Sequence, residues 1–566
     1  MTQEKTLTGY PSIDKPWLKY YKSEDLSFRV PKCKIYDHMK AQTVEYSGSV
    51  ALDYYGIKVT YKKMHEKIES GAKSLKVLGV QPGDIVSVCL PNTPEVVYVF
   101  YAINRVGAVA NMLDPRSSEG SLERALVDAK SKVLITLELV EEKFSKIRRS
   151  TQIEHFVSVS ALESVPLLFK LPSVGKRKKS ADVISWKKFL DIGKAYMGVV
   201  DAAYVEDTAA VIAYTGGTTG EPKGVVATNE NLNSIIAMNE KNEFGVSVGE
   251  RSLNIAPPWT YYGLNNCLNA FLCMGQQVIM IPKFGPTELG EIVYKQKPNH
   301  IITVPSTLVA VMNYEKLKKC DLSFLKTIIV GADKLDETFE EQFNTFLKEH
   351  NSKVVLTKGY GMTELTAAAT YTKDNCNGIG SVGIPYIGNT VAIFEPDTWP
   401  EKELLIGERG EIAITGPSVT KGYFGSFGAE NESIIKLHSD GKLWVHTGDI
   451  GHLDENGKLY IDGRIKRMFV KNGYKVFPGE IERQIMKHDE VRNCAVISVE
   501  DRDSGNAIKA FVVLREDTEQ KRVSEELYSL LREGLYDYEV PEKIEFIKAL
   551  PLTGMGKVDY RALEKM

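Results

Sequence analysis

Short runs of apolar residues alternate with segments of helical pattern from about residue 45 to about residue 400. Several of these runs are apolar throughout, which is typical of strands that are covered on both faces. Between two of them, Thr93 can cap a helix, Pro94 fits its first turn, and Gly107 can end it. The pattern predicts an α/β fold with mostly parallel sheets and packed helices. The predicted strands are 85–89, 133–136, 211–215, 278–281, 301–304, 328–330 and 354–357.

The C-terminal part of the chain, about a hundred residues long, has a different pattern. Asp454 and Gly457 lie in a short polar segment between two strand-like runs, which indicates a β-hairpin. We therefore expect a large N-terminal domain of residues 1–463 and a small, mobile α+β domain of residues 464–566. The elements predicted in the small domain are a helix at 478–488, strands at 494–499 and 508–514, a helix at 525–535 and a strand at 544–547.

Composition adds limits to this picture. A chain of 566 residues is too long for one compact core and predicts two or more domains. Its net charge of −3 creates no strong field for nucleic acid, so we expect no nucleic-acid partner. Its seven cysteines are scattered without a Cys-x-x-Cys pair, which favours reduced thiols. With no signal-peptide pattern and no apolar run long enough to span a bilayer, we expect a cytoplasmic protein.

One segment, 165–179, combines an apolar run with four consecutive basic residues. A solvated surface insertion is the favoured interpretation. A patch that contacts an anionic membrane is the alternative.

A segment rich in glycine and threonine follows the apolar residues 211–213, with the sequence Tyr-Thr-Gly-Gly-Thr-Thr-Gly-Glu-Pro-Lys-Gly. Its backbone N–H groups and hydroxyl groups can converge on phosphate oxygens, and Lys223 adds a positive charge. It is not a Walker A loop, because no Gly-Lys-Ser/Thr follows at the required spacing. The strand before it and the lysine after it favour a phosphate loop over a flexible turn.

This segment resembles the phosphate loop of the acyl-adenylate-forming (AMP-binding) superfamily, which includes acyl-CoA and aryl-CoA synthetases, stand-alone adenylation domains and luciferases. The family loop reads Thr-Ser-Gly-Thr-Thr-Gly-x-Pro-Lys-Gly, and Gly216 replaces the serine here. The resemblance runs from about residue 35 to the C-terminus. It implies a phosphate-binding role for Thr215, Gly216, Gly217, Thr218, Thr219, Gly220 and Lys223.

The segment 359–364 reads Gly-Tyr-Gly-Met-Thr-Glu and resembles the family's Tyr-Gly-x-Thr-Glu motif. By itself such a segment is more often a simple turn. The resemblance implies that Tyr360 stacks near adenine, Thr363 bonds the α-phosphate, and Glu364 holds Mg²⁺. A carboxylate suits that role because Mg²⁺ is a hard cation that takes oxygen ligands. The other residues implied to line the adenine and acyl pockets are Gly331, Ala332, Leu335 and Gly359.

Two charged residues, Asp449 and Arg464, have the family's spacing. Taken singly, they would be a turn residue and a surface charge. In the family the aspartate accepts hydrogen bonds from both ribose hydroxyls and the arginine assists. A carboxylate is a natural acceptor for a vicinal diol. The resemblance therefore implies a ribose site at Asp449 and Arg464, with Ile461 beside them.

A lysine near the C-terminus, Lys557, lies in the segment Pro-Leu-Thr-Gly-Met-Gly-Lys. Such a lysine is normally a solvated charge. The family's Pro-x-Thr-x-x-Gly-Lys segment carries a lysine that bridges the substrate carboxylate and the α-phosphate, so the resemblance implies a catalytic role for Lys557. It also implies a hinge at Lys466.

The segment 257–263, Pro-Pro-Trp-Thr-Tyr-Tyr-Gly, resembles the stretch that borders the family's acyl site. The resemblance implies acyl contacts at Trp259, Tyr262 and Gly263, although aromatic residues here could equally pack in the core. Thr260 stands where the family commonly has histidine. This difference disfavours an acyl-site entrance that is gated by a histidine ring. Residues 257–266 contain no aspartate that would pair with an α-ammonium group, which disfavours amino-acid substrates.

The acceptor of the acyl group is addressed by the segment 470–474, which resembles the loop that meets the pantetheine of CoA, with Gly473 and Tyr474 as the implied contacts. The favoured function is activation of a medium-chain, long-chain or aryl acid with ATP and Mg²⁺, pyrophosphate release and transfer to CoA. A stand-alone adenylation enzyme that loads a separate carrier protein stays open. A non-catalytic nucleotide-binding relative is the remote alternative.

Overall fold

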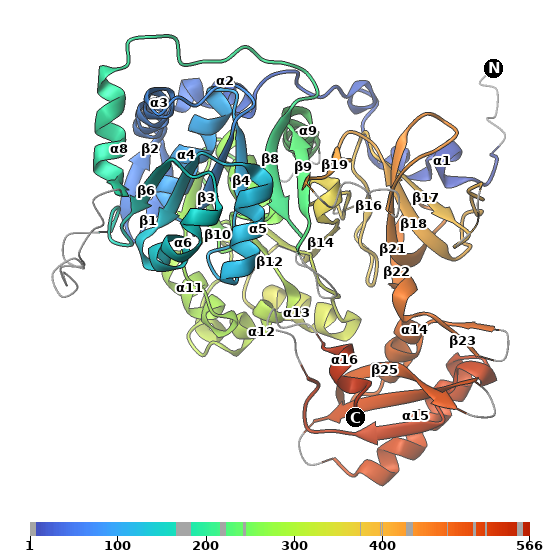
Figure 1. Ribbon diagram of the computed structural model, residues 1–566. Helices are drawn as coiled ribbons and strands as arrows, with labels where there is room; N and C mark the ends of the chain where they lie inside the picture. The colour runs from blue at the N-terminus through green and yellow to red at the C-terminus, as the bar shows by residue number, and fades with distance from the viewer. Residues whose placement is uncertain are drawn as a thin grey trace.

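The computed structural model describes residues 7–165, 183–215, 222–241, 245–373, 375–396, 398, 400–425, 434–471, 474–501, 505–515, 518–551 and 558–566. It has the α/β fold that the sequence predicts, with helices packed on sheets that are mostly parallel (Figure 1).

Two large sheets form most of the N-terminal part. Both are parallel in the middle. The first sheet is antiparallel at both of its edges, and the second is antiparallel at one edge. In the described chain the first sheet has nine strands, in the order β16 (Ile384–Pro385), β15 (Thr370–Tyr371), β14 (Thr357–Tyr360), β13 (Thr327–Val330), β12 (His300–Thr303), β10 (Arg251–Asn254), β11 (Gln277–Met280), β1 (Val50–Tyr54) and β2 (Ile57–Thr60). Over the same residues the second has eight, in the order β19 (Gly422–Tyr423), β9 (Gly224–Thr228), β8 (Ala209–Tyr214), β4 (Val109–Met112), β3 (Ile85–Cys89), β5 (Val133–Leu137), β6 (His155–Val159) and β7 (Val183–Ser185).

The largest apolar core joins residues of both sheets to the helices α3 (Tyr61–Val77) and α4 (Pro94–Arg105). Every residue of α4 is buried, which explains why its sequence is almost continuously apolar. The remaining helices of this part are α1 (Pro11–Asp14), α2 (Ile35–Thr43), α5 (Glu119–Ala129), α6 (Glu141–Ile147), α8 (Trp186–Ile192), α9 (Asn229–Lys241), the π-helix η7 (Tyr262–Asn269), α10 (Ala270–Cys273), α11 (Leu289–Gln296), α12 (Pro305–Asn313) and α13 (Glu337–Glu349).

A third sheet is built around β21 (Leu443–Leu453), which pairs with β18, β20 and β22. The predicted hairpin is confirmed: Gly457 has a φ of +80° and donates a backbone hydrogen bond of 2.8 Å to the carbonyl of Asp454. The other strands of this sheet are β17 (Thr390–Phe394), β18 (Gly410–Thr415), β20 (Ile435–Leu437) and β22 (Leu459–Arg464).

The C-terminal elements follow one another in the order that the sequence predicts. They enclose an apolar core of their own. Figure 1 shows them gathered below β22, apart from the two large sheets. The elements are β23 (Phe469–Lys471), β24 (Tyr474–Val476), α14 (Pro478–Ile485), β25 (Val491–Asp501), β26 (Gly505–Leu514), α15 (Gln520–Gly534), β27 (Lys543–Phe546) and α16 (Tyr560–Leu563).

Two ion pairs join α14 to the third sheet. Arg483 Nη2 lies 3.0 Å from Asp462 Oδ1, and Arg409 Nη1 lies 2.5 Å from Glu480 Oε2. Beside them, α14 approaches β22 so closely that a Cβ on Gly479 would lie 2.2 Å from the Asp462 carbonyl oxygen. The small C-terminal unit is thereby held against the larger part through one helix.

Most predicted strands overlap observed ones, and 85–89 coincides with β3. The strand predicted at 354–357 is displaced by three residues, because β14 begins only at Thr357, where pairing with β13 becomes available. Val355 in the preceding run is 48% exposed and therefore does not belong to the covered part of the sheet. Thr93 occupies the N-cap of α4 as predicted, but its hydroxyl makes no capping hydrogen bond.

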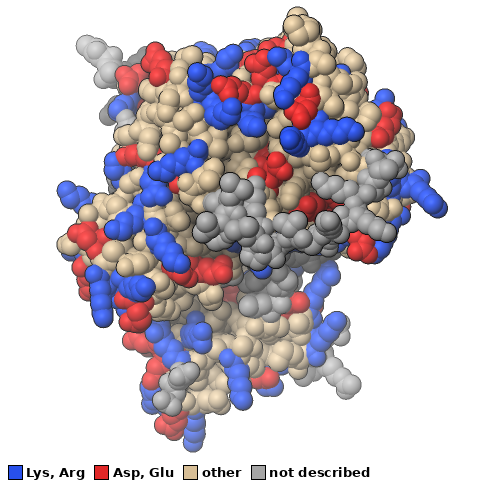
Figure 2. Space-filling view, turned by 90° about the vertical axis from the view of Figure 1, so that its left-hand side faces the viewer, with Lys and Arg blue, Asp and Glu red and all other residues tan. Residues whose placement is uncertain are grey.

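The distribution of surface charge and the state of the cysteines agree with what the composition indicates. Figure 2 shows lysines and arginines interspersed with acidic residues over the visible face, without a large area of one sign. All seven cysteines lie in the described ranges, and each is a free thiol. Among the helices of the described residues, none has the length and apolar character needed to cross a membrane. The segment 166–182, which holds most of the predicted apolar and basic insertion, lies outside the described residues.

Candidate active site

A cavity of about 2220 Å³ lies beyond the carboxyl ends of β10, β12, β13 and β14 and extends to the C-terminal unit. Parallel α/β sheets bind ligands at this end of their strands, because helix N-termini and loops converge there. The predicted site residues that line it are Thr215, Lys223, Trp259, Tyr262, Gly331, Ala332, Leu335, Gly359, Tyr360, Thr363, Glu364, Asp449, Ile461, Arg464 and Lys466.

A three-residue contact on one wall of the cavity is centred on Asp449 of β21. Its Oδ2 accepts a hydrogen bond of 2.6 Å from the hydroxyl of Tyr360, and its Oδ1 lies 2.6 Å from Nε of Arg464. The side chain of Asp449 is 6% exposed, whereas that of Arg464 is 62% exposed. Burial and the neighbouring carboxylate raise the pKa of Tyr360 well above its ordinary value, so this hydroxyl keeps its proton and acts as a donor.

Glu364 faces the cavity from the short turn after β14 and is buried, with 4% of the residue exposed. Burial raises the pKa of its carboxyl group, and a hydrogen bond of 2.7 Å from the hydroxyl of Tyr423 opposes that shift. The ammonium group of Lys223 lies 5.1 Å from the centre of the Tyr423 ring. A carboxylate, a cation and an aromatic ring therefore meet at one place.

The two ends of the predicted phosphate loop are joined to each other. Thr215 donates its backbone N–H to the carbonyl of Lys223 at 2.9 Å, and its hydroxyl accepts the Lys223 N–H at 3.1 Å. This pairing continues the antiparallel β8–β9 ladder and fixes where the loop begins and ends. Residues 216–221, including the predicted contacts Gly216, Gly217, Thr218, Thr219 and Gly220, lie outside the described residues.

The backbone around the second motif is tight. A Cβ on Gly361 would lie 2.0 Å from the carbonyl oxygen of Ala367, so only glycine fits there. Ala332 has a φ of +66°, which is uncommon for a residue with a side chain. Such backbone conformations cost free energy and concentrate at functional sites, which agrees with the position of both residues at the cavity.

The segment 257–263 folds into the entry of the π-helix η7, a type of helix that is frequent at functional sites. Thr260 accepts the N–H of Gly263 at 3.1 Å and donates to the carbonyl of Pro257 at 2.9 Å, so its hydroxyl stabilises the turn. A Cβ on Gly263 would lie 1.9 Å from that same carbonyl, which explains the glycine. Gly263 itself is not part of the cavity wall.

The aromatic residues of this segment differ in their roles. Tyr261 belongs to the core, where its hydroxyl donates to carbonyls of β8 and β9 at 3.0 and 2.8 Å. Trp259 faces the cavity, and the guanidinium carbon of Arg116 lies 5.1 Å from its ring centre. Tyr262 also reaches the cavity while its hydroxyl donates to Thr303 at 2.7 Å.

The remaining predicted residues concern the CoA contact, the hinge and the catalytic lysine. Tyr474 is 57% exposed, is absent from the cavity wall, and stacks on Tyr538 with ring centres 4.6 Å apart. Lys466 lies in a short 3₁₀ turn directly after β22. Gly473 and Lys557 lie outside the described residues, although the neighbouring residues 558–561 border the cavity.

Sequence reasoning missed Tyr423, which holds Glu364, and Arg116, which covers Trp259. Both come from segments distant in sequence from their partners, and neither lies in a motif. The Gly-Tyr pair of β19 could have been noticed only by its place after a strand-like run. Arg116 has no signal in the sequence.

Comparison with known proteins gives the class of this site. The AMP-binding enzyme family matches residues 39–424, and the AMP-binding enzyme C-terminal domain matches residues 480–557. The chain belongs to the AMP-binding enzyme family.

Two curated relatives align over most of both chains. A long-chain-fatty-acid–CoA ligase of Bacillus subtilis (strain 168) is 31% identical over 564 residues, with 97% of each chain covered. A feruloyl-CoA synthase of Amycolatopsis sp is 29% identical over 522 residues, covering 90% of this chain and 94% of that protein.

Among solved structures, ATP-bound MatB from Rhodopseudomonas palustris has the same fold. Its TM-score is 0.78 at 22% identity, with 94% of this chain and 99% of that chain covered.

Proposed function

We propose that this protein is an acid–thiol ligase of the AMP-forming class, which activates a carboxylic acid with ATP and transfers the acyl group to CoA. The observation that supports this most directly is Asp449, a buried carboxylate held by Tyr360 and Arg464 at the edge of a large cavity. The names of the curated relatives, CoA ligases for fatty and aryl acids, support the same class of reaction.

In the first step, a carboxylate oxygen of the acid attacks the α-phosphorus, and the bond from that phosphorus to the bridging oxygen breaks. Pyrophosphate leaves with the bonding electrons, and an acyl-adenylate remains. In the second step, the CoA thiolate attacks the acyl carbon, and AMP leaves. Because the first step brings together two anions, its barrier falls when cations and oriented donors lie where charge accumulates.

The chain's own residues have distinct tasks in this proposal. Asp449 accepts hydrogen bonds from the ribose hydroxyls, and Tyr360 and Arg464 hold its carboxylate in place. Thr363 donates to the α-phosphate, while Lys223 and the loop 215–220 bind the other phosphates. Lys557 neutralises charge between the acid and the α-phosphate. Gly331, Ala332, Gly359 and Ile461 line the adenine side.

The residues at Glu364 fit a Mg²⁺ ion. Its carboxylate is buried at the cavity wall, where burial penalises an uncompensated charge, and an oxygen donor is what this hard cation takes. When bound, the ion would neutralise charge on the phosphates. The hydrogen bond from Tyr423 holds the carboxylate in place at the cavity wall, whether or not an ion is bound.

The acid is proposed to be hydrophobic. Trp259 and Tyr262, with Leu335, contribute to a wall that also includes Phe271, Met274 and Phe284. This lining suits a hydrocarbon or aryl chain and provides no buried carboxylate for an α-ammonium group within residues 257–266. CoA as acceptor, with contacts at Gly473 and Tyr474, and a cytoplasmic setting remain predictions.

The other points of the sequence interpretation stay proposals. We propose a domain boundary after residue 463 with a hinge at Lys466, supported by the short turn that follows β22. A separate carrier protein is the alternative acceptor. The membrane contact of the insertion at 165–179 is the less favoured interpretation of that segment.

Pyrophosphate release is the experiment that tests the function. Decanoic, palmitic and 4-coumaric acids, with an amino acid for comparison, should be supplied with ATP and Mg²⁺, with and without CoA. We expect release with at least one apolar acid, and repeated turnover only when CoA is present. Lys557→Ala, which should slow acyl-adenylate formation by about 100-fold or more, provides the low-activity control. ATP binding without release for any acid would favour the non-catalytic alternative, and turnover with a carrier protein but not CoA would favour the loading enzyme.

A further inference from the structure

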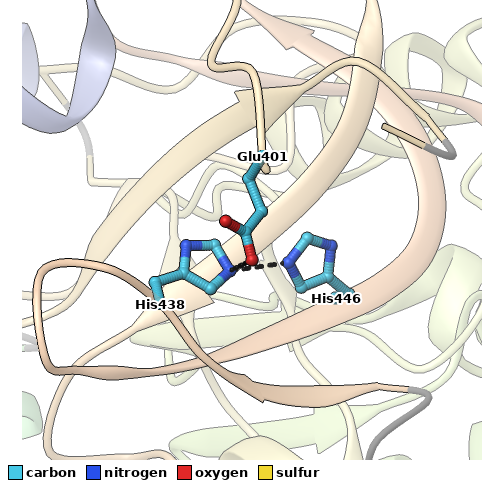
Figure 3. A group of neighbouring side chains, drawn as sticks. All are labelled: Glu401, His438 and His446. Carbon is cyan, nitrogen blue, oxygen red and sulfur yellow. Dashed lines mark hydrogen bonds and ion pairs between the residues drawn. The ribbon is translucent and has the colours of Figure 1, made fainter. Parts of the chain in front are cut away.

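Three titratable side chains converge on the third sheet, in a place that the proposed function does not use (Figure 3). His446 lies on β21, His438 lies in the turn that connects β20 to β21, and Glu401 comes from the loop between β17 and β18. The side chains are almost fully buried, with exposed fractions of 4%, 6% and 7%, respectively. Three separate segments therefore direct polar groups into one buried point.

The atoms that face one another are ligand atoms. Nε2 of His438 lies 2.9 Å from Nε2 of His446 and 3.4 Å from Oε1 of Glu401. All three atoms lie within 4.8 Å of one another. On a tetrahedral zinc ion, bonds of about 2.0–2.1 Å place neighbouring ligand atoms roughly 3.3 Å apart, which is close to the observed spacing.

Hydrogen bonds among these side chains leave one polar atom of the cluster without a partner. Nδ1 of His446 contacts Oε2 of Glu411 at 2.7 Å, and since a carboxylate only accepts, Nδ1 carries the hydrogen. In a neutral His446 ring Nε2 is then an acceptor, and the contact between the two Nε2 atoms uses the single hydrogen of His438 Nε2. Oε1 of Glu401 is then left, in the described part of the chain, as a buried carboxylate atom without a hydrogen-bond partner. Burying such an atom is costly, and a cation between the three atoms would satisfy all of them.

The surroundings are those of a metal centre. Glu411 fixes the ring of His446 from behind, in the carboxylate–histidine arrangement that orients metal-binding imidazoles. Phe394 and Trp444 pack on the histidine rings, with the Trp444 ring stacked on His438 at 5.3 Å. These rings lower the local dielectric, which strengthens electrostatic interactions among the three side chains.

We propose that Glu401, His438 and His446 bind one Zn²⁺ ion, with a water molecule as the fourth ligand. Two imidazoles and one carboxylate are a recognised zinc donor set, whereas Mg²⁺ prefers oxygen atoms alone. The ion would link Glu401 and its described neighbours at 400–403 to the β20–β21 hairpin. Because His446 and Asp449 share β21, the ion would also brace the strand that carries the proposed ribose ligand.

The test measures metal binding directly and does not depend on activity. The full-length chain, purified without a histidine tag, should be stripped with a chelator and titrated with Zn²⁺ against a chromophoric competitor, followed by elemental analysis. We expect one ion per chain with submicromolar affinity that excess Mg²⁺ does not displace. Co²⁺ substitution should give the visible absorption of a four-coordinate site with nitrogen and oxygen ligands.

Variants separate this site from adventitious binding. His438→Gln and Glu401→Gln should each weaken Zn²⁺ binding by about 100-fold or more, and Glu411→Gln by about 10- to 100-fold. His488→Gln is the matched control, since His488 lies in the other His/Glu cluster, beside Glu526 at 2.9 Å. The proposal is overturned if the parent retains less than about 0.1 equivalent of ion, or if His488→Gln removes binding while His438→Gln does not. If His438→Gln fails to fold, the Co²⁺ spectrum of the parent and the Glu411→Gln titration decide.

Discussion

The hydroxyl of Tyr360 donates a hydrogen bond of 2.6 Å to the carboxylate of Asp449, which joins the end of β14 to β21 across the cavity. Arg464 approaches the other carboxylate oxygen at the same distance. The carboxylate is therefore fixed from two sides before a nucleotide arrives, at the wall of the cavity.

Replacing Asp449 by asparagine should raise the KM for ATP by about 10- to 100-fold, because hydrogen bonds to a charged group contribute about 1.5–3 kcal/mol. Tyr360→Phe removes only the orienting bond and should raise KM by about 2- to 10-fold. Tyr528→Phe, which loses a weak bond of 3.4 Å on the exposed face of α15, is the control. Unchanged nucleotide binding in Asp449→Asn would contradict the ribose role.

Lys557→Ala should slow acyl-adenylate formation by about 100-fold or more, the usual loss when one transition-state contact is removed. Thioester formation from supplied acyl-adenylate should change much less, because its charge distribution no longer includes the attacking carboxylate. ATP–pyrophosphate exchange and single-turnover thioester formation measure the two steps. Lys565→Ala, an exposed tail lysine, is the control. Equal losses in both steps would refute an assignment to the first step alone.

Glu364→Gln should raise the Mg²⁺ concentration needed for half-maximal adenylation and slow the reaction, because an amide is a weaker ligand for a hard cation. Tyr423→Phe should have a smaller effect in the same direction, since the carboxylate stays but loses its orienting hydrogen bond. Glu341→Gln on the exposed face of α13 controls for a general change in charge. Superimposable Mg²⁺ titrations of Glu364→Gln and the parent would exclude the ligand role.

Lys466→Pro tests the proposed hinge. Proline fixes φ near −65° and restricts the dihedral change that a turning domain needs. ATP–pyrophosphate exchange should survive in large part, whereas overall thioester synthesis should fall sharply and supplied adenylate should not rescue it. Lys466→Ala removes the charge but not the flexibility, and it should behave like the parent. Proline losses that are equal in the two half reactions would argue against a mechanical role.

The free energy of unfolding should depend on pH through His65. Burial and the neighbouring Lys40 and Arg105 lower its pKa to about 4 in the folded chain, below the ordinary value of 6.5. The neutral ring is therefore favoured by folding, and this stabilisation is full above about pH 6.5 and is lost as the pH falls toward 4. Urea midpoints should show His65→Gln flattening this part of the curve by about 1–2 kcal/mol, after allowance for partial exposure. His155→Gln is the control, and an identical slope in both variants would contradict the assignment.

The fold was largely predictable because apolar strands have a local signal. Strand β3 coincides with its prediction, since both faces of the sheet are covered there. β14 does not, because Leu356 is buried without strand pairing: its N–H donates to the side chain of Asn344 at 2.8 Å. Composition cannot distinguish an apolar residue held by a side chain from one held by a neighbouring strand.

The site was predictable only where motifs mark it. Asp449 and Glu364 were found through their spacing, but the donors that hold them come from other parts of the chain. Tyr423 has no signal that connects it to Glu364, because β19 reaches the cavity only by pairing with β9. Glu401 and His438 were missed for a similar reason: the loop after β17 meets the β20–β21 hairpin only in three dimensions.

The two ion pairs of α14 make the orientation of the small C-terminal unit sensitive to salt concentration. Glu480 and Arg483 extend from one helix toward Arg409 and Asp462 on the larger part, and Arg409 and Arg483 remain partly exposed. A turn about Lys466 would have to part them, at up to about 1 kcal/mol each, and dissolved salt screens such pairs. Ionic strength would then shift the equilibrium between two orientations of the C-terminal unit. Low salt would favour the orientation described here, and high salt would favour the turned orientation proposed for the thioester step.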